Sequence, residues 1–237
     1  MKVASHLVTP PVRAILSVLC RVEAGELVKI PRKGPLIIVV NHVNFLEVPL
    51  IYSWLYPRDS VGMAKQETWN NPALAFLAFC WDAIPLNRQA TDLSAMRKAF
   101  AALEKGRILI LAPEGTRSGN GRLQQGHPGM VQIALNSGAP ILPLAHTGGE
   151  SFWSNFKSRR RTPFSFKVGQ AFHLVPPRDV DGRDLPVSRE IRREMTDEIM
   201  NRISILLPKA QRGAYPSPET ASQRHLCFTE TGEVHRT

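Results

Sequence analysis

The sequence predicts an α/β fold, with a mostly parallel central sheet flanked by helices and preceded by an N-terminal amphipathic helix. Two apolar runs, 36–40 and 108–111, have the length and composition of buried strands. Helical patterns alternate with these and other strand patterns, which is typical of a parallel sheet covered on both faces. Polar residues follow both runs directly, at the strand ends where open α/β sheets bind ligands. We therefore expect one cleft at these ends.

Composition narrows the class of protein without fixing its partner. The chain has 237 residues and is 43% hydrophobic, which suits one large α/β domain. Its net charge of +10 suits anionic partners such as phosphorylated substrates or acidic lipids, but it also serves solubility alone. The three cysteines lie far apart and form no CxxC pair, which indicates a reduced, intracellular protein. No apolar run approaches the ~18 residues that span a bilayer, and no secretion signal is evident.

Three parts are expected: an N-terminal membrane-contact segment at 1–27, a folded domain at 28–208 and a disordered tail at 209–237. The tail is assigned because it loses apolar periodicity and is rich in Ser, Thr, Pro and Glu. In the first part, a helix over 7–23 should be capped by Thr9. Its apolar stripe either lies in a membrane interface or packs on the domain. The stripe consists of Val8, Val12, Ile15, Leu16, Leu19 and Val22.

Within the domain, residue patterns predict the individual elements. Residues 72–81 are apolar all round, so they form either a buried core helix or a wall for an apolar ligand. Residues 164–168 alternate as an edge strand does. The other expected helices are 48–56, 92–105, 129–136 and 188–207, and the other expected strands are 61–64, 83–86, 107–112 and 141–145.

A histidine and a carboxylate follow the first buried strand. Neutral imidazole has a pKa near ~6.5 and can accept a hydroxyl proton, so His42 is the candidate general base. Glu47 can orient the ring and stabilise the imidazolium, as the third member of a catalytic triad does. On one continuous helix the two would point about 140° apart, so His42 must stand on the strand-to-helix turn and Glu47 in the first helical turn. Taken alone, the pair is also explained by a core histidine beside a capping carboxylate.

The loop after the second buried strand has anion-binding chemistry. Gly115 allows backbone amides to turn toward an anion. Thr116 and Ser118 add hydroxyl donors, and Arg117 supplies a planar fork for phosphate. Glu114 is acidic in an otherwise anion-binding loop, so we expect it to hold either Arg117 or an acceptor hydroxyl. The alternative is a surface turn with a solvated arginine, which the histidine and carboxylate at the other strand end disfavour.

The sequence points to direct chemistry without a covalent enzyme intermediate. It lacks a Gly-x-Ser-x-Gly elbow, and no cysteine lies in a catalytic context. The histidines and Glu47 show no recognised ligand spacing, so neither a metal nor another cofactor is predicted.

Four motifs occur in order: Asn41-His42-x4-Glu47, then 84–88, 113–118 and 139–143, which read IPLNR, PEGTRS and APILP. They resemble the four motifs of the glycerolipid acyltransferase family, typified by 1-acylglycerol-3-phosphate acyltransferase. The resemblance covers about residues 28–175. The Glu-Gly-Thr-Arg-Ser motif at this distance after Asn-His-x4-acid makes it specific.

This resemblance implies a mostly parallel sheet at a membrane surface and a transfer reaction. An acyl group would pass from acyl-CoA or acyl-carrier protein to a hydroxyl of a lysophospholipid, in particular 1-acylglycerol-3-phosphate. The donor is a substrate, so no cofactor is implied. His42 would be the base and Glu47 its partner. The residues expected to bind substrate are Arg88, Glu114, Gly115, Thr116, Arg117, Ser118 and Gly129.

The chain departs from the family pattern at four positions. Glu47 stands where Asp is usual, and Asn87 where Asp often precedes the arginine. His127 replaces a common Lys, and Ala112 replaces a frequent Phe. These departures leave the reaction type intact and bear on the choice of acceptor.

Rival functions use the same features differently. A non-enzymatic lipid-binding scaffold would keep the apolar surface and the charge, and would tolerate loss of His42. An acyl thioesterase would use the same pair to activate water. Nucleic-acid binding is not expected. It would need basic residues interleaved with aromatic residues on one face, and only residues 157–161 hint at such a pattern. The expected location is peripheral, on the cytoplasmic face of a membrane.

Overall fold

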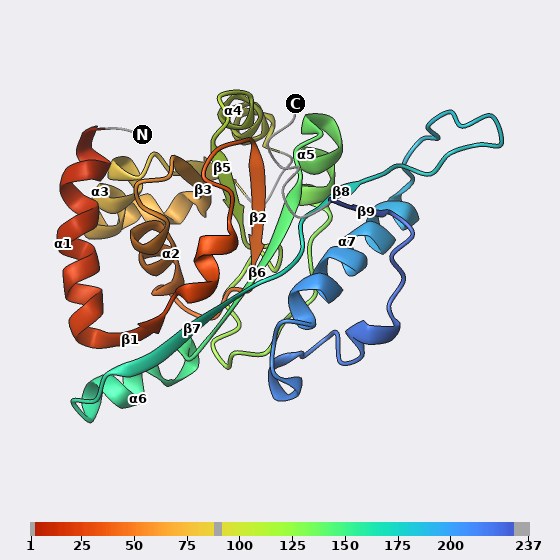
Figure 1. Ribbon diagram of the computed structural model, residues 1–237. Helices are drawn as coiled ribbons and strands as arrows, with labels where there is room; N and C mark the ends of the chain where they lie inside the picture. Colours follow the sequence, from red (N-terminus) through yellow and green to blue (C-terminus); the bar gives the residue numbers. More distant parts are fainter. Residues whose placement is uncertain (1–2, 88–91, 230–237) are drawn as a thin grey trace.

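The structure is a computed structural model that describes residues 3–87 and 92–229. In this part of the chain a nine-stranded sheet has the order β1-β7-β6-β2-β5-β3-β4, with β8 pairing with β6 and β9 with β8 (Figure 1). The strands are β1 (Cys20–Glu23), β2 (Leu36–Val40), β3 (Ser60–Lys65), β4 (Ile84–Leu86), β5 (Ile108–Leu111), β6 (Ile141–Thr147), β7 (Thr162–Val168), β8 (Phe172–Leu174) and β9 (Leu226–Phe228).

Helices cover both faces of the sheet, which confirms the predicted fold class. Ile37 and Val39 of β2 pack in one core with α4, α5 and α7, while Leu36, Ile38 and Val40 pack in the other with α1 and α2 (Figure 1). This alternation follows from the two-residue period of a strand. The helices are α1 (Val3–Leu19), α2 (Glu47–Leu55), α3 (Pro72–Cys80), α4 (Leu93–Glu104), α5 (Gly129–Ser137), α6 (Phe152–Lys157) and α7 (Arg189–Ser204).

Strand β2 is the centre of the parallel part of the sheet. It pairs in parallel with β5 on one side, where Ile38 faces Ile110, and with β6 on the other, where Ile38 faces Leu142. The carboxyl ends of β2, β5 and β6 therefore lie at one edge. The chain leaves β2 toward β3 on one side and reaches β6 on the other, which is the arrangement that opens a ligand crevice in α/β sheets.

The N-terminal helix differs from the prediction at both ends. It begins at Val3, so Thr9 does not cap it, and it ends at Leu19, where the chain continues as β1 and pairs in parallel with β7. Packing overrides the two prolines inside the helix. Thr9 is buried and accepts a hydrogen bond from the indole N–H of Trp81 at 3.1 Å.

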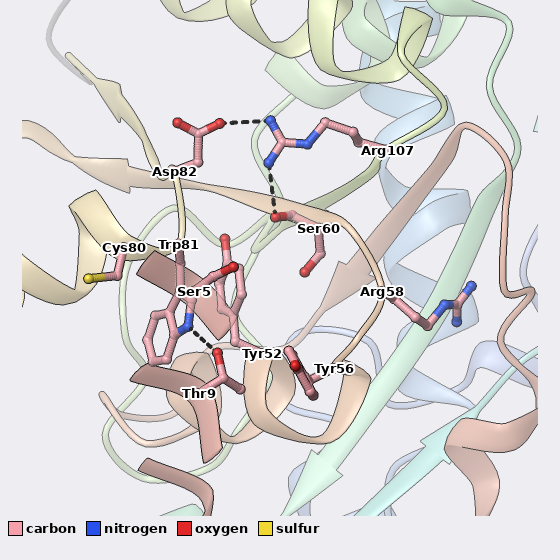
Figure 2. Close-up of a pocket in the computed structure, with 10 residues that line it drawn as sticks. All are labelled: Ser5, Thr9, Tyr52, Tyr56, Arg58, Ser60, Cys80, Trp81, Asp82 and Arg107. Carbon is pink, nitrogen blue, oxygen red and sulfur yellow. Dashed lines mark hydrogen bonds and ion pairs between the residues drawn. The ribbon is translucent and has the colours of Figure 1, made fainter. Parts of the chain in front are cut away.

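A small cavity lies where the first part of α1 meets the domain (Figure 2). Thr9, Tyr52, Trp81 and Arg58 are among its lining residues, and the rings of Tyr52 and Trp81 stack at 4.8 Å. Its volume of about 10 Å³ has room for roughly one water molecule. It is a packing gap beneath α1 rather than a substrate site.

The apolar surface of α1 is divided between the domain and the exterior. Leu16 of the predicted stripe is buried and Val8 and Val12 are half-buried, but Ile15 is exposed. The helix buries Ser5 and Thr9 instead, and a row of apolar side chains on it remains exposed. That row contains Val3, Leu7, Ile15 and Val18, which are 77%, 72%, 60% and 71% exposed.

Helix α3 is not a buried core helix. Its Ala78 and Cys80 are buried, but Phe76 and Phe79 are 57% and 61% exposed. Of the two predicted roles, an apolar wall open to the exterior fits this exposure.

The prediction of an edge strand at 164–168 is wrong. Strand β7 is interior, because β1 pairs with it on one side and β6 on the other. Its alternating burial arises because every second residue faces the α1–α2 core, where Phe164 and Phe166 are buried.

The prediction of a disordered tail at 209–237 is wrong for 209–229, and residues 230–237 lie outside the described chain. Strand β9 pairs with β8, and Tyr215 is buried. The tail lacks apolar periodicity because polar contacts hold it. Glu198 of α7 accepts from the backbone N–H groups of Arg224 and His225, and the Tyr215 hydroxyl donates to Asp197.

Candidate active site

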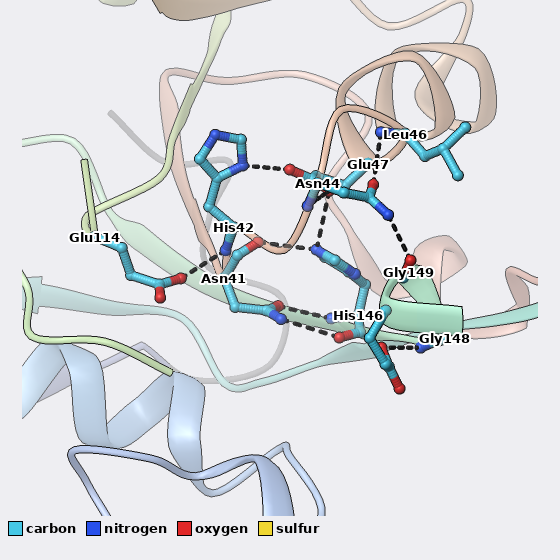
Figure 3. Close-up of polar contacts among 10 residues, drawn as sticks. Asn41, His42, Asn44, Leu46, Glu47, Glu114, His146, Gly148 and Gly149 are labelled. Atoms are coloured by element: carbon cyan, nitrogen blue, oxygen red, sulfur yellow. Dashed lines mark hydrogen bonds and ion pairs between the residues drawn. The ribbon is translucent and has the colours of Figure 1, made fainter. Parts of the chain in front are cut away.

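Three neighbouring strand ends form the site. His42 follows β2, Glu114 follows β5, and His146 lies near the end of β6 (Figure 3). The sequence predicted the first two as partners in one cleft, and the structure brings them into contact. The backbone N–H of His42 donates to Glu114 Oε1 at 2.6 Å.

His42 and Glu47 are directly hydrogen-bonded. The Nδ1 atom of His42 contacts Glu47 Oε1 (Figure 3). His42 stands in the turn after β2, and Glu47 is the first residue of α2, as the spacing required. Asn44 shapes this turn, because its Oδ1 accepts from the Leu46 N–H at 2.8 Å while its own N–H donates to Glu47 Oε2 at 3.0 Å. The pairing leaves Nε2 as the imidazole nitrogen that can face a substrate.

The environment keeps Glu47 charged. Burial opposes the carboxylate, whose side chain is 1% exposed. The hydrogen bonds that it accepts from His42 and from the Asn44 amide nevertheless hold the pKa of Glu47 below its ordinary value. A carboxylate that stays ionised fixes the tautomer with Nδ1–H toward Glu47 and Nε2 free to accept a proton.

Glu114 makes the contacts of a positioning residue. It is 1% exposed, and its second oxygen accepts from the backbone N–H of Gln124 at 2.8 Å. Its two oxygens thus tie the His42 turn to the loop after β5. The described residues show no ion pair between Glu114 and Arg117, so that predicted pairing is wrong. The other option, contact with an acceptor hydroxyl, stays a prediction.

Ionisation of the Glu114 carboxyl makes the folding stability of the protein depend on pH. Burial raises the pKa of Glu114 from 4.5 to about 7, with a further contribution from the charge of Glu47. The unfolded chain therefore loses this proton at lower pH than the folded chain, so stability is full below pH 4.5 and falls as pH rises toward 7. Relative to Glu114→Gln, which carries no titrating proton, the wild type should lose roughly 3 kcal/mol across this window. Urea unfolding at pH 5, 6, 7 and 8 measures the difference, and parallel curves for the two proteins would rule out the raised pKa.

The loop after β5 is built around Gly115. Its φ of +66° is in the left-handed region, and a Cβ there would lie 2.8 Å from His127 Cδ2. The amides predicted to face an anion are partly used inside the protein. Ser118 N–H donates to the carbonyl of His42 at 2.8 Å, and Gly119 N–H donates to that of Val43 at 3.0 Å. In the described chain, the amides of Thr116 and Arg117 donate to no protein acceptor.

The remaining predicted substrate residues differ in position. Thr116 and Arg117 are exposed beside the His42 turn, because the next residue, Ser118, bonds to it. Gly129 is exposed at the first position of α5. Arg88 lies outside the described residues, so its predicted role is not addressed by the structure.

The sequence prediction missed the pair formed by His146 and Asn41. Asn41 exchanges two hydrogen bonds with the backbone of His146, and the His146 ring contacts the Asn41 carbonyl at 2.9 Å (Figure 3). His146 Nε2 lies 3.8 Å from Glu47 Oε2. Burial lowers the pKa of His146, which favours a neutral ring behind Glu47. The sequence signal that could have revealed this pair is His146 itself, a polar residue directly after the expected strand at 141–145.

In residues 3–87 and 92–229, no group of three or more His, Cys, Asp and Glu side chains is arranged to hold a metal ion. Over the same residues, every helix is too short or too polar to cross a bilayer.

The fold and the site define a histidine–carboxylate protein of the α/β class, and comparison with known proteins supplies the family. The model of the Acyltransferase family matches residues 21–147, more than half of the chain. This protein therefore belongs to the Acyltransferase family, which confirms the resemblance read from the four motifs.

Individual relatives are similar over different lengths. The 1-acyl-sn-glycerol-3-phosphate acyltransferase of Limnanthes alba is 34% identical over 149 residues, covering 61% of this chain and 50% of the relative. The enzyme of the same name from Bacillus subtilis is 26% identical over 195 residues, which cover 82% of this chain and 92% of that relative. This chain thus spans about half the length of the plant relative.

A solved structure supports the fold. The 1-acyl-sn-glycerophosphate (LPA) acyltransferase PlsC from Thermotoga maritima superposes with a TM-score of 0.58 at 24% identity, covering 82% of this chain and 76% of that one.

Proposed function

We propose that this protein is an O-acyltransferase of phospholipid synthesis. It transfers a fatty acyl group from acyl-CoA or acyl-carrier protein to the free hydroxyl of a lysophospholipid, specifically 1-acylglycerol-3-phosphate. The observation that carries the proposal is the direct contact between His42 Nδ1 and the buried carboxylate of Glu47. The family and the names of the relatives support the same reaction.

The contact assigns the proton transfers. His42 Nε2 accepts the proton of the acceptor hydroxyl while its oxygen attacks the thioester carbonyl carbon. The C–S bond breaks as the tetrahedral intermediate collapses, and the thiolate takes the proton back from the imidazolium. Glu47 stabilises the imidazolium between these steps. A thioester is already activated, so general-base assistance of roughly 10²–10⁴-fold and correct alignment of the hydroxyl supply much of what is needed.

The loop after β5 recognises the phosphate in this proposal. Arg117 supplies the fork, and the exposed hydroxyl of Thr116 is a further donor. The unpaired amides of these two residues are the donors available for phosphate or for the developing thioester oxyanion. Arg88, brought in by the family resemblance, would add a second guanidinium.

A transfer assay with a panel of acceptors tests the proposal. Purified protein is given radiolabelled acyl-CoA with glycerol-3-phosphate, lysophosphatidic acid or lysophosphatidylcholine, and the series is repeated with acyl-carrier protein. Labelled phosphatidic acid is the expected product. Release of labelled fatty acid without acceptor dependence would instead identify a thioesterase, and the absence of turnover with both donors would favour a scaffold.

The exposed apolar row of α1 can enter the interface of a lipid membrane. Leu7→Gln, Ile15→Gln and Val18→Gln together should reduce sedimentation with phospholipid vesicles at least about tenfold, because three exposed apolar side chains no longer enter the interface. The fold should be unaffected, since these side chains are already exposed. Vesicle sedimentation measures the effect, and Val180→Gln with Leu185→Gln, exposed elsewhere, is the control. Unchanged sedimentation of the triple variant would exclude α1 as a membrane contact.

A further inference from the structure

A second exposed apolar and basic surface lies at the end of the molecule that carries the site. Trp153 and Phe156 of α6 are 55% and 51% exposed. Lys157, Arg159 and Arg160 follow them and are also exposed. In the part of the chain that the structure describes, none of these three cations forms an ion pair. These five residues are called the α6 patch below.

The patch is attached to the active-site turn. The ring of Phe45, three residues after His42, lies 5.7 Å from that of Trp153. The side-chain amide of Asn44 donates to the Gly149 carbonyl just before α6. Through these contacts α6 and the catalytic turn form one packed unit, so a surface that receives the patch also lies beside the site.

The patch is also joined to the end of α1. The Nη2 atom of Arg161 donates to the carbonyls of Ser17 at 2.6 Å and Cys20 at 2.8 Å. Val18, between these two residues, is 71% exposed. Figure 1 shows α6 beside β1 and the C-terminal end of α1. The apolar row of α1 thus leads toward the patch.

The residue types identify the partner. Tryptophan and phenylalanine beside lysine and arginine are the composition of interfacial anchors, in which the rings enter the headgroup boundary and the cations stay at its surface. Unpaired basic side chains are attracted to anionic lipid headgroups. We propose that the α6 patch docks on an anionic membrane surface and holds the active-site turn against it. This inference rests on the proposed function, because it explains how a lipid acceptor reaches His42.

A charge-removal variant tests the docking. Lys157→Gln, Arg159→Asn and Arg160→Gln remove three charges, and Asn is chosen because Arg159 has a φ of +53° that asparagine tolerates. The matched control removes Arg178, Arg183 and Arg189, which are exposed in the segment between β8 and the start of α7. Binding to vesicles of phosphatidylcholine with one-quarter phosphatidylglycerol is compared with binding to pure phosphatidylcholine, in the absence of any acyl donor.

The variant should lose roughly a hundredfold in affinity for the anionic vesicles, with little change on pure phosphatidylcholine and none in the control. High salt should weaken wild-type binding in the same way. Unchanged affinity of the variant for anionic vesicles would overturn the proposal. Loss of activity only with acyl-carrier protein, at unchanged vesicle binding, would also overturn it and assign the patch to the donor protein.

Transfer to a dispersed, short-chain lysophosphatidic acid separates this inference from the proposed function. Wild type and charge-removal variant should have equal rates on this acceptor, since it needs no membrane. If the wild type transfers no acyl group, the proposed function fails. If it transfers while the variant binds anionic vesicles as well as the wild type does, only the docking fails.

Discussion

Replacing His42 by alanine should reduce acyl transfer by about 10²–10⁴-fold, because the base that removes the acceptor proton is lost. Binding of both substrates should change far less, since the Arg117 loop remains. The measurement is kcat with saturating acyl-CoA and lysophosphatidic acid. A folded variant within threefold of the wild-type rate would remove His42 from the mechanism.

This variant also carries a stability cost that must be separated from catalysis. His42 donates to a buried carboxylate oxygen of Glu47, and leaving that oxygen unpaired costs roughly 1–3 kcal/mol. Urea unfolding therefore accompanies the kinetics. Glu47→Gln supplies the comparison, because it should keep measurable activity with the base in place but without the orienting charge.

The second large effect concerns the acceptor. Arg117→Ala should raise the KM for lysophosphatidic acid ten- to a hundredfold, because a charge-assisted hydrogen bond to phosphate is worth roughly 1.5–3 kcal/mol. The KM for acyl-CoA should hardly change. Arg117 is exposed on the loop, so removing it leaves no buried group unpaired.

Two variants sharpen this test. Arg117→Lys should recover only part of the affinity, since an ammonium keeps the charge but not the fork. Arg122→Ala removes an exposed arginine from the same loop and should leave the acceptor KM nearly unchanged. A neutral acceptor such as monoacylglycerol should be poor with the wild type and insensitive to Arg117→Ala. A wild-type preference for that neutral acceptor would make the phosphate assignment wrong.

The sequence predicted the secondary structure correctly where the apolar residues followed a single clear pattern. The continuous apolar run 36–40 identified β2, and the helix expected at 129–136 is α5, Gly129–Ser137. The His42–Glu47 contact also followed from spacing, because a turn and then a helix begin within those five residues. These features are local, so local patterns predict them.

What the sequence did not reveal depends on partners distant in the chain. The helical pattern at 20–23 became strand β1 because β7 pairs with it. The tail has no apolar period because Glu198 and Asp197 hold it through polar contacts. In the site, the contact between Glu114 and the His42 turn joins two strand ends that are 72 residues apart, so local patterns do not reveal it.

In the proposed mechanism, the oxygen of the acceptor hydroxyl, activated by His42, is the nucleophile that ends up bonded to the acyl carbon. The most direct measurement uses lysophosphatidic acid whose free hydroxyl carries oxygen-18, together with acyl-CoA, and locates the label by mass spectrometry. We predict that phosphatidic acid forms with the label retained in the bridging oxygen of the new ester, and that His42→Ala forms almost none. Consumption of acyl-CoA that yields free fatty acid containing solvent oxygen, with no labelled phosphatidic acid, would contradict the account.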